Sequence, residues 1–91
     1  MADTHATTIT VIIKNPEKLL YEGTAKSVSS IDEKGVFDIL PQHSNFISII
    51  KDHVMVHKVD GTIQEFKCRE GVLRVEDNII KAYVDILPVK Q

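Results

Sequence analysis

Short apolar segments with a two-residue period constrain the fold of this chain more than any other feature. In the first of them, Ile9, Val11 and Ile13 recur at every second position among β-branched neighbours. This alternation suits a β-strand with one buried face, and no window of about a dozen residues keeps the period of an amphipathic helix without a turn signal. We therefore expect an all-β protein with about nine or ten short strands, arranged as a sandwich or a barrel.

Turn signals divide the chain into these segments. Asp60 and Gly61 separate two alternating runs and predict a β-hairpin with a type I′ turn, since both residue types accept a positive φ. Glu76, Asp77 and Asn78 predict a second hairpin with a polar three-residue turn. The expected strands cover residues 9–13, 19–21, 24–31, 36–40, 46–50, 54–59, 62–68, 72–75 and 79–85.

Length and charge limit the protein to one modest domain and narrow its partners. A chain of 91 residues has room for a single core, so we expect one domain over residues 1–91. Its 11 basic and 13 acidic residues are interspersed and give a net charge of −2. Because no basic run could neutralise a row of phosphates, we expect no nucleic-acid partner.

The chain lacks signals for membrane insertion or secretion. Its apolar runs are far shorter than the roughly 20 residues that span a bilayer, and its first residues have neither the basic nor the apolar region of a signal peptide. Cys68 is the only cysteine, which excludes an internal disulfide and a multi-cysteine zinc site. Its alternation with Phe66 predicts a thiol buried in the core. A cytoplasm-like compartment is the expected location.

The side chains that could support catalysis or metal binding lack the partners that such chemistry requires. His53 and His57 share one strand face but lie roughly 13 Å apart, which is too far to ligate one ion. Asp38, His43 and Ser44 supply the residue types of a hydrolase triad, without a Gly-x-Ser-x-Gly elbow or a glycine-lined oxyanion hole. We expect neither a catalytic residue nor a bound metal or cofactor.

Residues 46–50 carry more apolar surface than a sandwich strand needs. Phe46 and Ile50 occupy one face, whereas Ile47 and Ile49 occupy the other, although only one face of a strand meets the core. The second face is covered either within the chain, by a loop or a barrel end, or by a protein partner, which we favour. The alternative is a free sandwich that binds a small ligand or a carbohydrate, although the chain has no Trp and only 2 Tyr and 3 Phe for an aromatic platform.

Four motifs follow one another along nearly the whole chain. They are Leu20-Tyr21-x-Gly23, Gly35-x-Phe37-x-Ile39-Leu40-Pro41-x-His43-x-x-Phe46, Glu70-Gly71-Val72-Leu73-x-Val75, and Asn78 ahead of a segment that ends Tyr83-Val84-Asp85. In order and spacing they resemble the N-terminal domain of the epsilon subunit of F-type ATP synthases. Phe46 after His43 resembles the sodium-translocating or alternate branch of that family. The resemblance implies a flattened, ten-stranded β-sandwich of two sheets.

The resemblance also implies a function. Domains of this family are non-catalytic rotor components of the central stalk, which link the gamma subunit to the membrane ring of proteolipid subunits and couple proton or sodium flow to rotation. By position, the residues that face the ring are Glu33, Lys34, Gly35, Val36, Gln42 and His43, and those that face gamma are Ser44, Asn45 and Phe46. The implied location is peripheral, on the cytoplasmic face of the cell membrane, and we expect the isolated chain to be a monomer.

The chain departs from the family pattern in two residues and in its length. Asp38 stands where the family often has Gly, and Val36 where an acidic residue often contacts the ring, so Asp32 or Glu33 is expected to supply that contact. Full-length family members continue into a helical hairpin that can bind ATP and inhibit hydrolysis. Because this chain ends before such a hairpin, we expect it neither to bind ATP nor to inhibit its hydrolysis.

Overall fold

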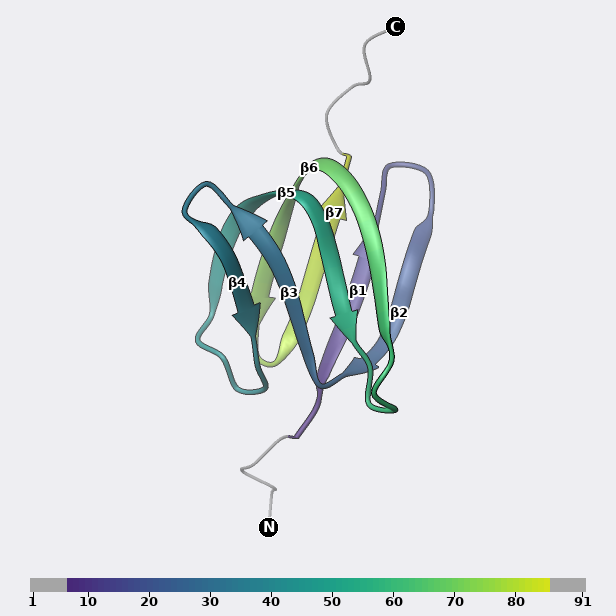
Figure 1. Cartoon of the computed structure of the whole chain (residues 1–91), viewed down its shortest axis with the longest axis vertical. Coiled ribbons are helices and arrows are strands. Elements are labelled where there is room, and N and C mark those ends of the chain that lie inside the picture. Colours follow the sequence, from purple (N-terminus) through teal and green to yellow (C-terminus); the bar gives the residue numbers. More distant parts are fainter. Residues whose placement is uncertain (1–6, 86–91) are drawn as a thin grey trace, which may run out of the picture.

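The computed structural model describes residues 7–85. In this range it contains β-strands and no helix (Figure 1). The expectation of an all-β fold is therefore confirmed for this part of the chain. No helix that could cross a membrane occurs among these residues. The strands are β1 (Ile9–Lys14), β2 (Leu19–Ala25), β3 (Ser27–Asp32), β4 (Gly35–Ile39), β5 (Phe46–His57), β6 (Ile63–Glu76) and β7 (Ile79–Val84).

The strands are hydrogen-bonded into one mixed, seven-stranded sheet in the order β2-β1-β7-β6-β5-β3-β4. Neighbouring strands are antiparallel, except that β1 and β7 pair in parallel from Thr10 opposite Ile79 to Lys14 opposite Tyr83. The last strand therefore lies inside the sheet, between β1 and β6, and only β2 and β4 form its two ends.

The two longest strands bend and carry the sheet over the core. Residues 46–50 of β5 pair with β6 alone, whereas residues 51–57 pair with β6 and, in part, with β3. A register shift between Lys51 and Asp52 marks a β-bulge, where Asp52 has a φ of 72°. One layer thus contains β2, β1, β7, the second half of β6 and the first half of β5. The other layer contains the first half of β6 and the second half of β5, together with β3 and β4 (Figure 1).

The structure corrects the expected strand count and the separation into two sheets. Among residues 7–85 the segments 46–50 and 54–59 merge into β5, and the segments 62–68 and 72–75 merge into β6. The polar residues between these segments form the bulge and the bend of continuous strands, not turns that end them. For this reason the residues form a seven-stranded sheet folded on itself, where ten strands in two sheets were predicted.

The core lies between the two layers and consists of aliphatic side chains alone. All of its members are at most 2% exposed. They are Ile9, Val11, Ile13, Ala25, Val28, Ile39, Ile50, Val54, Val56, Leu73, Val75, Ile80, Ala82 and Val84. They recur at every second position in β1 and β7, as expected for strands with one buried face.

Two aromatic pairs close the sides of the sandwich. Phe37 of β4 meets Phe46 of β5 edge to face, with ring centroids 6.0 Å apart. On the opposite side Tyr21 of β2 meets Phe66 of β6, with centroids 5.8 Å apart. Neither pair of strands is hydrogen-bonded together, so the rings bridge two seams that the sheet leaves open. Such a pair contributes about 0.5–1.5 kcal/mol beyond its buried area.

The hairpin between β5 and β6 is confirmed, but its predicted turn type is wrong. The N–H of Gly61 donates to the carbonyl of Lys58 at 3.0 Å, and the N–H of Lys58 donates to the carbonyl of Thr62 at 2.8 Å. Gly61 has a φ of 94°, whereas Asp60 has no positive φ. A type I′ turn needs a positive φ at both central residues, so this loop is a longer one that ends in a glycine bulge.

The hairpin between β6 and β7 is also confirmed, with a shorter turn than predicted. Glu76 pairs directly with Ile79, so only two residues form the turn. Asp77 and Asn78 have φ values of 52° and 66°, which identifies the type I′ geometry. Asp and Asn tolerate this conformation better than other non-glycine residues.

Cys68 packs against the core but is only partly buried, whereas the sequence predicted a thiol buried in the core. Burial, together with the nearby carboxylates of Asp85 and Asp52, raises the pKa of the thiol to about 11. A thiol that stays protonated is a poor nucleophile, so the site does not have the environment of a reactive cysteine.

Replacement of Gly71 by Ala should destabilise the fold. A Cβ at Gly71 would lie 2.5 Å from the backbone oxygen of Tyr83, so the backbone of β6 or β7 would have to move. We expect a loss of about 1–3 kcal/mol in unfolding free energy, measured by urea denaturation. The control is Gly23→Ala, whose Cβ would meet only the flexible side chain of Tyr21, at 3.2 Å. Equal midpoints for the two variants would contradict the close approach at Gly71.

The raised pKa of Cys68 should slow its alkylation. At pH 9 an ordinary thiol with a pKa of 9.0 is half ionised, whereas a thiol with a pKa of about 11 is roughly 1% ionised. We expect iodoacetamide to react roughly 50-fold more slowly with the folded protein than with the urea-unfolded chain at pH 9. Because the folded state holds this proton more tightly, its contribution to stability should be lost as the pH rises from 9 towards 11. A folded-state rate that levels off near pH 9 would contradict the raised pKa.

Candidate partner-docking site

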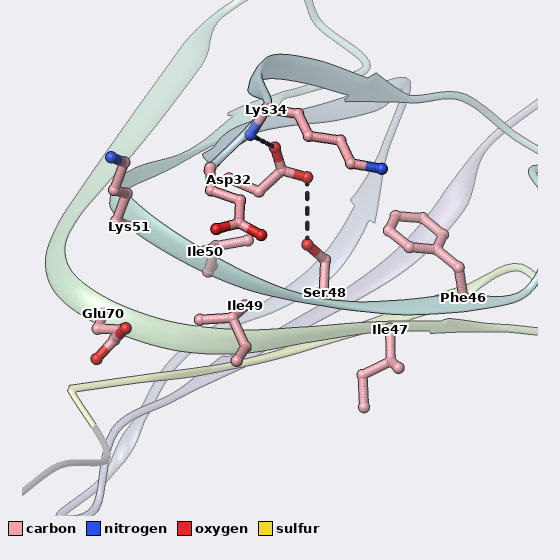
Figure 2. A pocket seen from close by; sticks show the side chains of 10 residues that line it. Asp32, Lys34, Phe46, Ile47, Ser48, Ile49, Ile50, Lys51 and Glu70 are labelled. Atoms are coloured by element: carbon pink, nitrogen blue, oxygen red, sulfur yellow. Dashed lines mark hydrogen bonds between the residues drawn. The ribbon is translucent and has the colours of Figure 1, made fainter.

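A groove runs beside the first half of β5 and encloses about 570 Å³. Its far wall is the turn between β3 and β4, where the side chain of Asp32 accepts a hydrogen bond from the backbone N–H of Lys34 at 2.8 Å. The Ser48 hydroxyl donates to the other carboxylate oxygen of Asp32 at 3.3 Å and so ties the two walls together (Figure 2). The groove is lined by Asp32, Glu33, Lys34, Phe46, Ile47, Ser48, Ile49, Ile50, Lys51 and Glu70.

Ile47 and Ile49 form an exposed apolar pair on the outer face of β5. Their exposed fractions are 65% and 63%, whereas Ile50 is fully buried. Figure 2 shows both side chains on the opposite side of the strand from Ser48 and Phe46. The predicted surplus of apolar surface is therefore confirmed, and no residue in the range 7–85 buries it.

Phe46 is partly buried and packs against two other rings. Its ring points inward against Phe37 and lies 5.1 Å from the ring of His43, so it is only partly exposed. This ring closes one seam of the sandwich. The apolar side chains on this strand that are open to a partner are therefore Ile47 and Ile49, which the alternation of the sequence had already placed on the other face.

The corner between β4 and β5 is fixed by hydrogen bonds to the turn between β6 and β7. The N–H of His43 donates to the carbonyl of Leu40 at 3.2 Å, and Gln42 has a φ of 65°, the geometry of a type II turn around Pro41. The backbone N–H of Gln42 also donates to the side-chain oxygen of Asn78 at 2.8 Å. The corner is therefore held in one conformation against the adjoining hairpin.

The remaining corner residues share this support. The side-chain oxygen of Asn45 accepts a hydrogen bond from the N–H of Asp77 at 3.1 Å. Nδ1 of His43 lies 2.9 Å from the carbonyl oxygen of Ser44, to which it must donate. Ser44 is exposed, as are His43 and Asn45.

The residues predicted to face the ring do not form one cluster. Glu33, Lys34, Gly35 and Val36 lie at the turn that begins β4, whereas Gln42 and His43 follow the other end of this strand (Figure 1). β4 pairs only with β3, so it is an edge of the sheet. Val36 is 73% exposed on this edge, and Gly35 has a φ of 125° that favours glycine. The six residues together mark the two ends of a single sheet edge.

The side chains of Asp38, His43 and Ser44 do not form a hydrogen-bonded triad. The Asp38 carboxylate accepts a hydrogen bond from the hydroxyl of Ser29, which is 8% exposed, and not from His43. Nε2 of His57 lies 2.9 Å from the same hydroxyl. Because the Ser29 proton goes to a carboxylate, His57 must donate to this oxygen and cannot act as its base. This polar chain brings together residues of three strands, and no pattern in the sequence predicted it.

The histidines likewise form no metal centre in the part of the chain that the structure describes. His53 lies 3.8 Å from a carboxylate oxygen of Glu65. No group of three or more His, Cys, Asp or Glu side chains suited to a metal ion occurs among residues 7–85.

Known proteins of similar sequence and fold place this domain in context. The ATP synthase epsilon chain of a Nitratiruptor species is 32% identical over 79 residues, which cover 86% of this chain and 61% of that protein. The ATP synthase epsilon chain of Campylobacter fetus subsp. fetus gives the same identity and coverage. The chain therefore spans about three fifths of the length of these curated relatives.

Solved structures share the fold at much lower sequence identity. A chain in the cryo-EM structure of Euglena gracilis mitochondrial ATP synthase, OSCP/F1/c-ring, matches 90% of this chain with 53% of its own length, at a TM-score of 0.82 and 12% identity. A chain in the Tetrahymena thermophila mitochondrial ATP synthase central stalk and c-ring structure matches 82% of this chain with 61% of its own length, at a TM-score of 0.67 and 14% identity.

A family model decides the assignment. The model of the ATP synthase delta/epsilon chain beta-sandwich domain matches residues 8–87, which include all seven strands. This chain therefore belongs to the family of ATP synthase delta/epsilon chain beta-sandwich domains.

Proposed function

We propose that this domain is a rotor component of the central stalk of an F-type ATP synthase. It links the gamma subunit to the membrane ring of proteolipid subunits and couples proton or sodium flow to rotation. The observation that carries this proposal is the exposed pair Ile47 and Ile49 on a domain that belongs to the ATP synthase delta/epsilon family. An apolar pair that the domain leaves open suits a permanent partner better than a freely diffusing ligand.

The proposed ring-facing surface is the β4 edge. Glu33 and Lys34 offer opposite charges at one end, and Gln42 and His43 offer hydrogen-bonding groups at the other. Exposed Val36 lies on the strand between them. Polar contacts at two separated points resist rocking of the domain on the ring better than contacts at one point would. Glu33 is the acidic group that would replace the one missing at Val36.

The proposed gamma-facing surface begins at the corner and continues along β5. Ser44 and Asn45 supply polar contacts at the rim, and Ile47 and Ile49 supply the apolar centre. Phe46 supports this surface from inside through its ring contact with Phe37. Apolar residues in the middle and polar residues around them are the usual arrangement of a stable protein interface.

This role needs no catalytic group, cofactor or bound ATP from the domain. A joint that transmits torque needs a stiff body and two anchored surfaces, and the corner hydrogen bonds and the closed seams supply that stiffness. The domain would lie peripherally at the cytoplasmic face of the cell membrane through its complex, and alone it would be a monomer.

A small-ligand or carbohydrate-binding sandwich is the second candidate. The groove volume of about 570 Å³ lies within the range of ligand pockets. Among the described residues that line it, however, Phe46 is the only aromatic one, and its ring packs against Phe37 in the seam. Sugar platforms use exposed aromatic faces, so the groove fits this role less well.

Substitution of Ile49 by Asp should weaken binding to the gamma subunit of the same organism. A charge at the apolar centre of the interface would be buried without a partner, so we expect at least a roughly 30-fold rise in Kd in calorimetric titration, equivalent to about 2 kcal/mol. The matched control is Ile63→Asp, because Ile63 is also exposed, at 55%, but lies on the other layer. Equal losses in the two variants, or none in either, would place the gamma interface elsewhere.

A cysteine at Val36 should form a disulfide with the polar loops of the proteolipid ring. The test uses Val36→Cys in a Cys68→Ser background, reconstituted with the complex whose ring loops carry a cysteine, under mild oxidation. We expect cross-linking at position 36, since this edge would face the ring, and none for Ile63→Cys in the same background. Cross-linking at position 63 alone would contradict the assigned orientation.

A further inference from the structure

The first half of β5 is a sheet edge inside the fold. Residues 46–50 pair with residues 71–75 of β6, and in the described range no strand pairs with their other side. Six consecutive residues, 46–51, line the groove. Consecutive residues point to alternate faces of a strand, so the groove runs along the strand's edge and not over one of its faces.

Hydrogen bonds at the bend show which backbone groups point into this groove. The carbonyl of Glu70 accepts from the N–H of Asp85, so it points toward β7. Backbone groups alternate in direction along a strand, so those of Gly71 point toward β5, where Gly71 lies opposite Ile50. The backbone groups of Ile50 and Ser48 are therefore bonded to β6. Those of Ile47 and Ile49 face the open edge.

The second half of β5 has the same alternation. The carbonyl of His57 accepts from the N–H of Lys26, on the side of β3. Odd-numbered residues of β5 thus direct their backbone groups away from β6 at both ends of the strand. β3 takes up these groups after the bulge, and no described strand does so before it.

This edge lacks the protection that the other sheet edges have. β2 carries Glu22 and β4 carries Asp38, and charges of this kind discourage the pairing of edges. Residues 46–50 contain no charge and no proline, and their outward side chains are Ile47 and Ile49. An uncharged apolar edge with open backbone groups is suited to accept another strand.

We propose that an extended segment of the gamma subunit adds a strand to this edge of β5. The inference rests on the proposed function and specifies how that partner binds. The added strand would pair its backbone with Ile47 and Ile49 and place alternate apolar side chains beside theirs. Its length would match residues 46–50, because the bulge at Lys51 and Asp52 ends the open edge.

The charges of the groove indicate one further property of the added strand. Lys51 and Glu70 both line the groove and carry opposite charges, so together they add nothing to its net charge. The remaining charged residues of the lining are Asp32, Glu33 and Lys34, which leave an excess of one negative charge. A Lys or Arg in the segment near the β3–β4 turn would balance this charge.

Amide hydrogen exchange followed by NMR tests the proposal directly. In the free domain the amides of Ile47 and Ile49 should exchange freely, whereas those of Ser48 and Ile50, which bond to β6, should be protected. Binding of the gamma subunit should slow exchange at Ile47 and Ile49 by at least about 100-fold and change Ser48 and Ile50 little. Ser48 and Ile50 serve as internal controls, so no variant that could unfold is needed.

Each other outcome identifies what has failed. If size-exclusion chromatography shows no complex with gamma, the proposed function fails and this inference fails with it. If the complex forms but Ile47 and Ile49 still exchange freely, the domain binds gamma without strand addition and only this inference is overturned. Protection at both amides in the free domain, or protection that grows with its own concentration, would also overturn it, the latter because a second copy would then occupy the edge.

Discussion

The bent β5–β6 ladder is the constraint on which the rest of the structure depends, because one hairpin supplies strands to both layers. A strand that crosses from one layer to the other must keep its apolar residues inward on both sides of the bend. In β6 the inward residues have even numbers before the bend, as in Phe66 and Cys68. After the bend they have odd numbers, as in Leu73 and Val75. The extra residue of the bulge makes this change possible, since a shift of one residue turns every following side chain to the opposite face. Gly71 then lets the bent strand approach β7 closely.

The bend also explains why β5 has an open backbone edge beside the proposed docking surface. Residues 46–50 of β5 lie in the first layer, where β3 does not pair with them, and β4 is not hydrogen-bonded to them either. A ring pair, Phe37 and Phe46, closes the core at this point without satisfying the backbone of β5. The bend that gives the sandwich its two layers therefore leaves one side of residues 46–50 without backbone partners among the described strands. The exposed side chains of Ile47 and Ile49 lie on this same segment.

The sequence predicted the fold class, the hairpins and the inward pattern because these depend on local alternation and turn residues. It could not predict that residues 46–50 and 54–59 belong to one strand, since Lys51-Asp52-His53 has the composition of a turn and forms a bulge only because β6 pairs across it. It identified the two faces of residues 46–50, whereas the family resemblance, and not this alternation, assigned Phe46 to the partner contact. The inward position of that ring depends on Phe37 and His43, which are set by tertiary packing. The hydrogen bond from Ser29 to Asp38 arises from the pairing of β3 with β4, so the sequence alone could not predict it.

The parallel pairing of β1 with β7 has a mechanical consequence. The two strands run side by side through five registered pairs, and they are the first and last strands of the described chain. A force that draws the start of β1 and the end of β7 apart acts along the strands and strains all the hydrogen bonds between them at once. If the first and last strands were antiparallel neighbours, the same force would act at one end of the pair. The hydrogen bonds would then break one after another. The pair formed by these two strands therefore resists a pull along the strands as one unit.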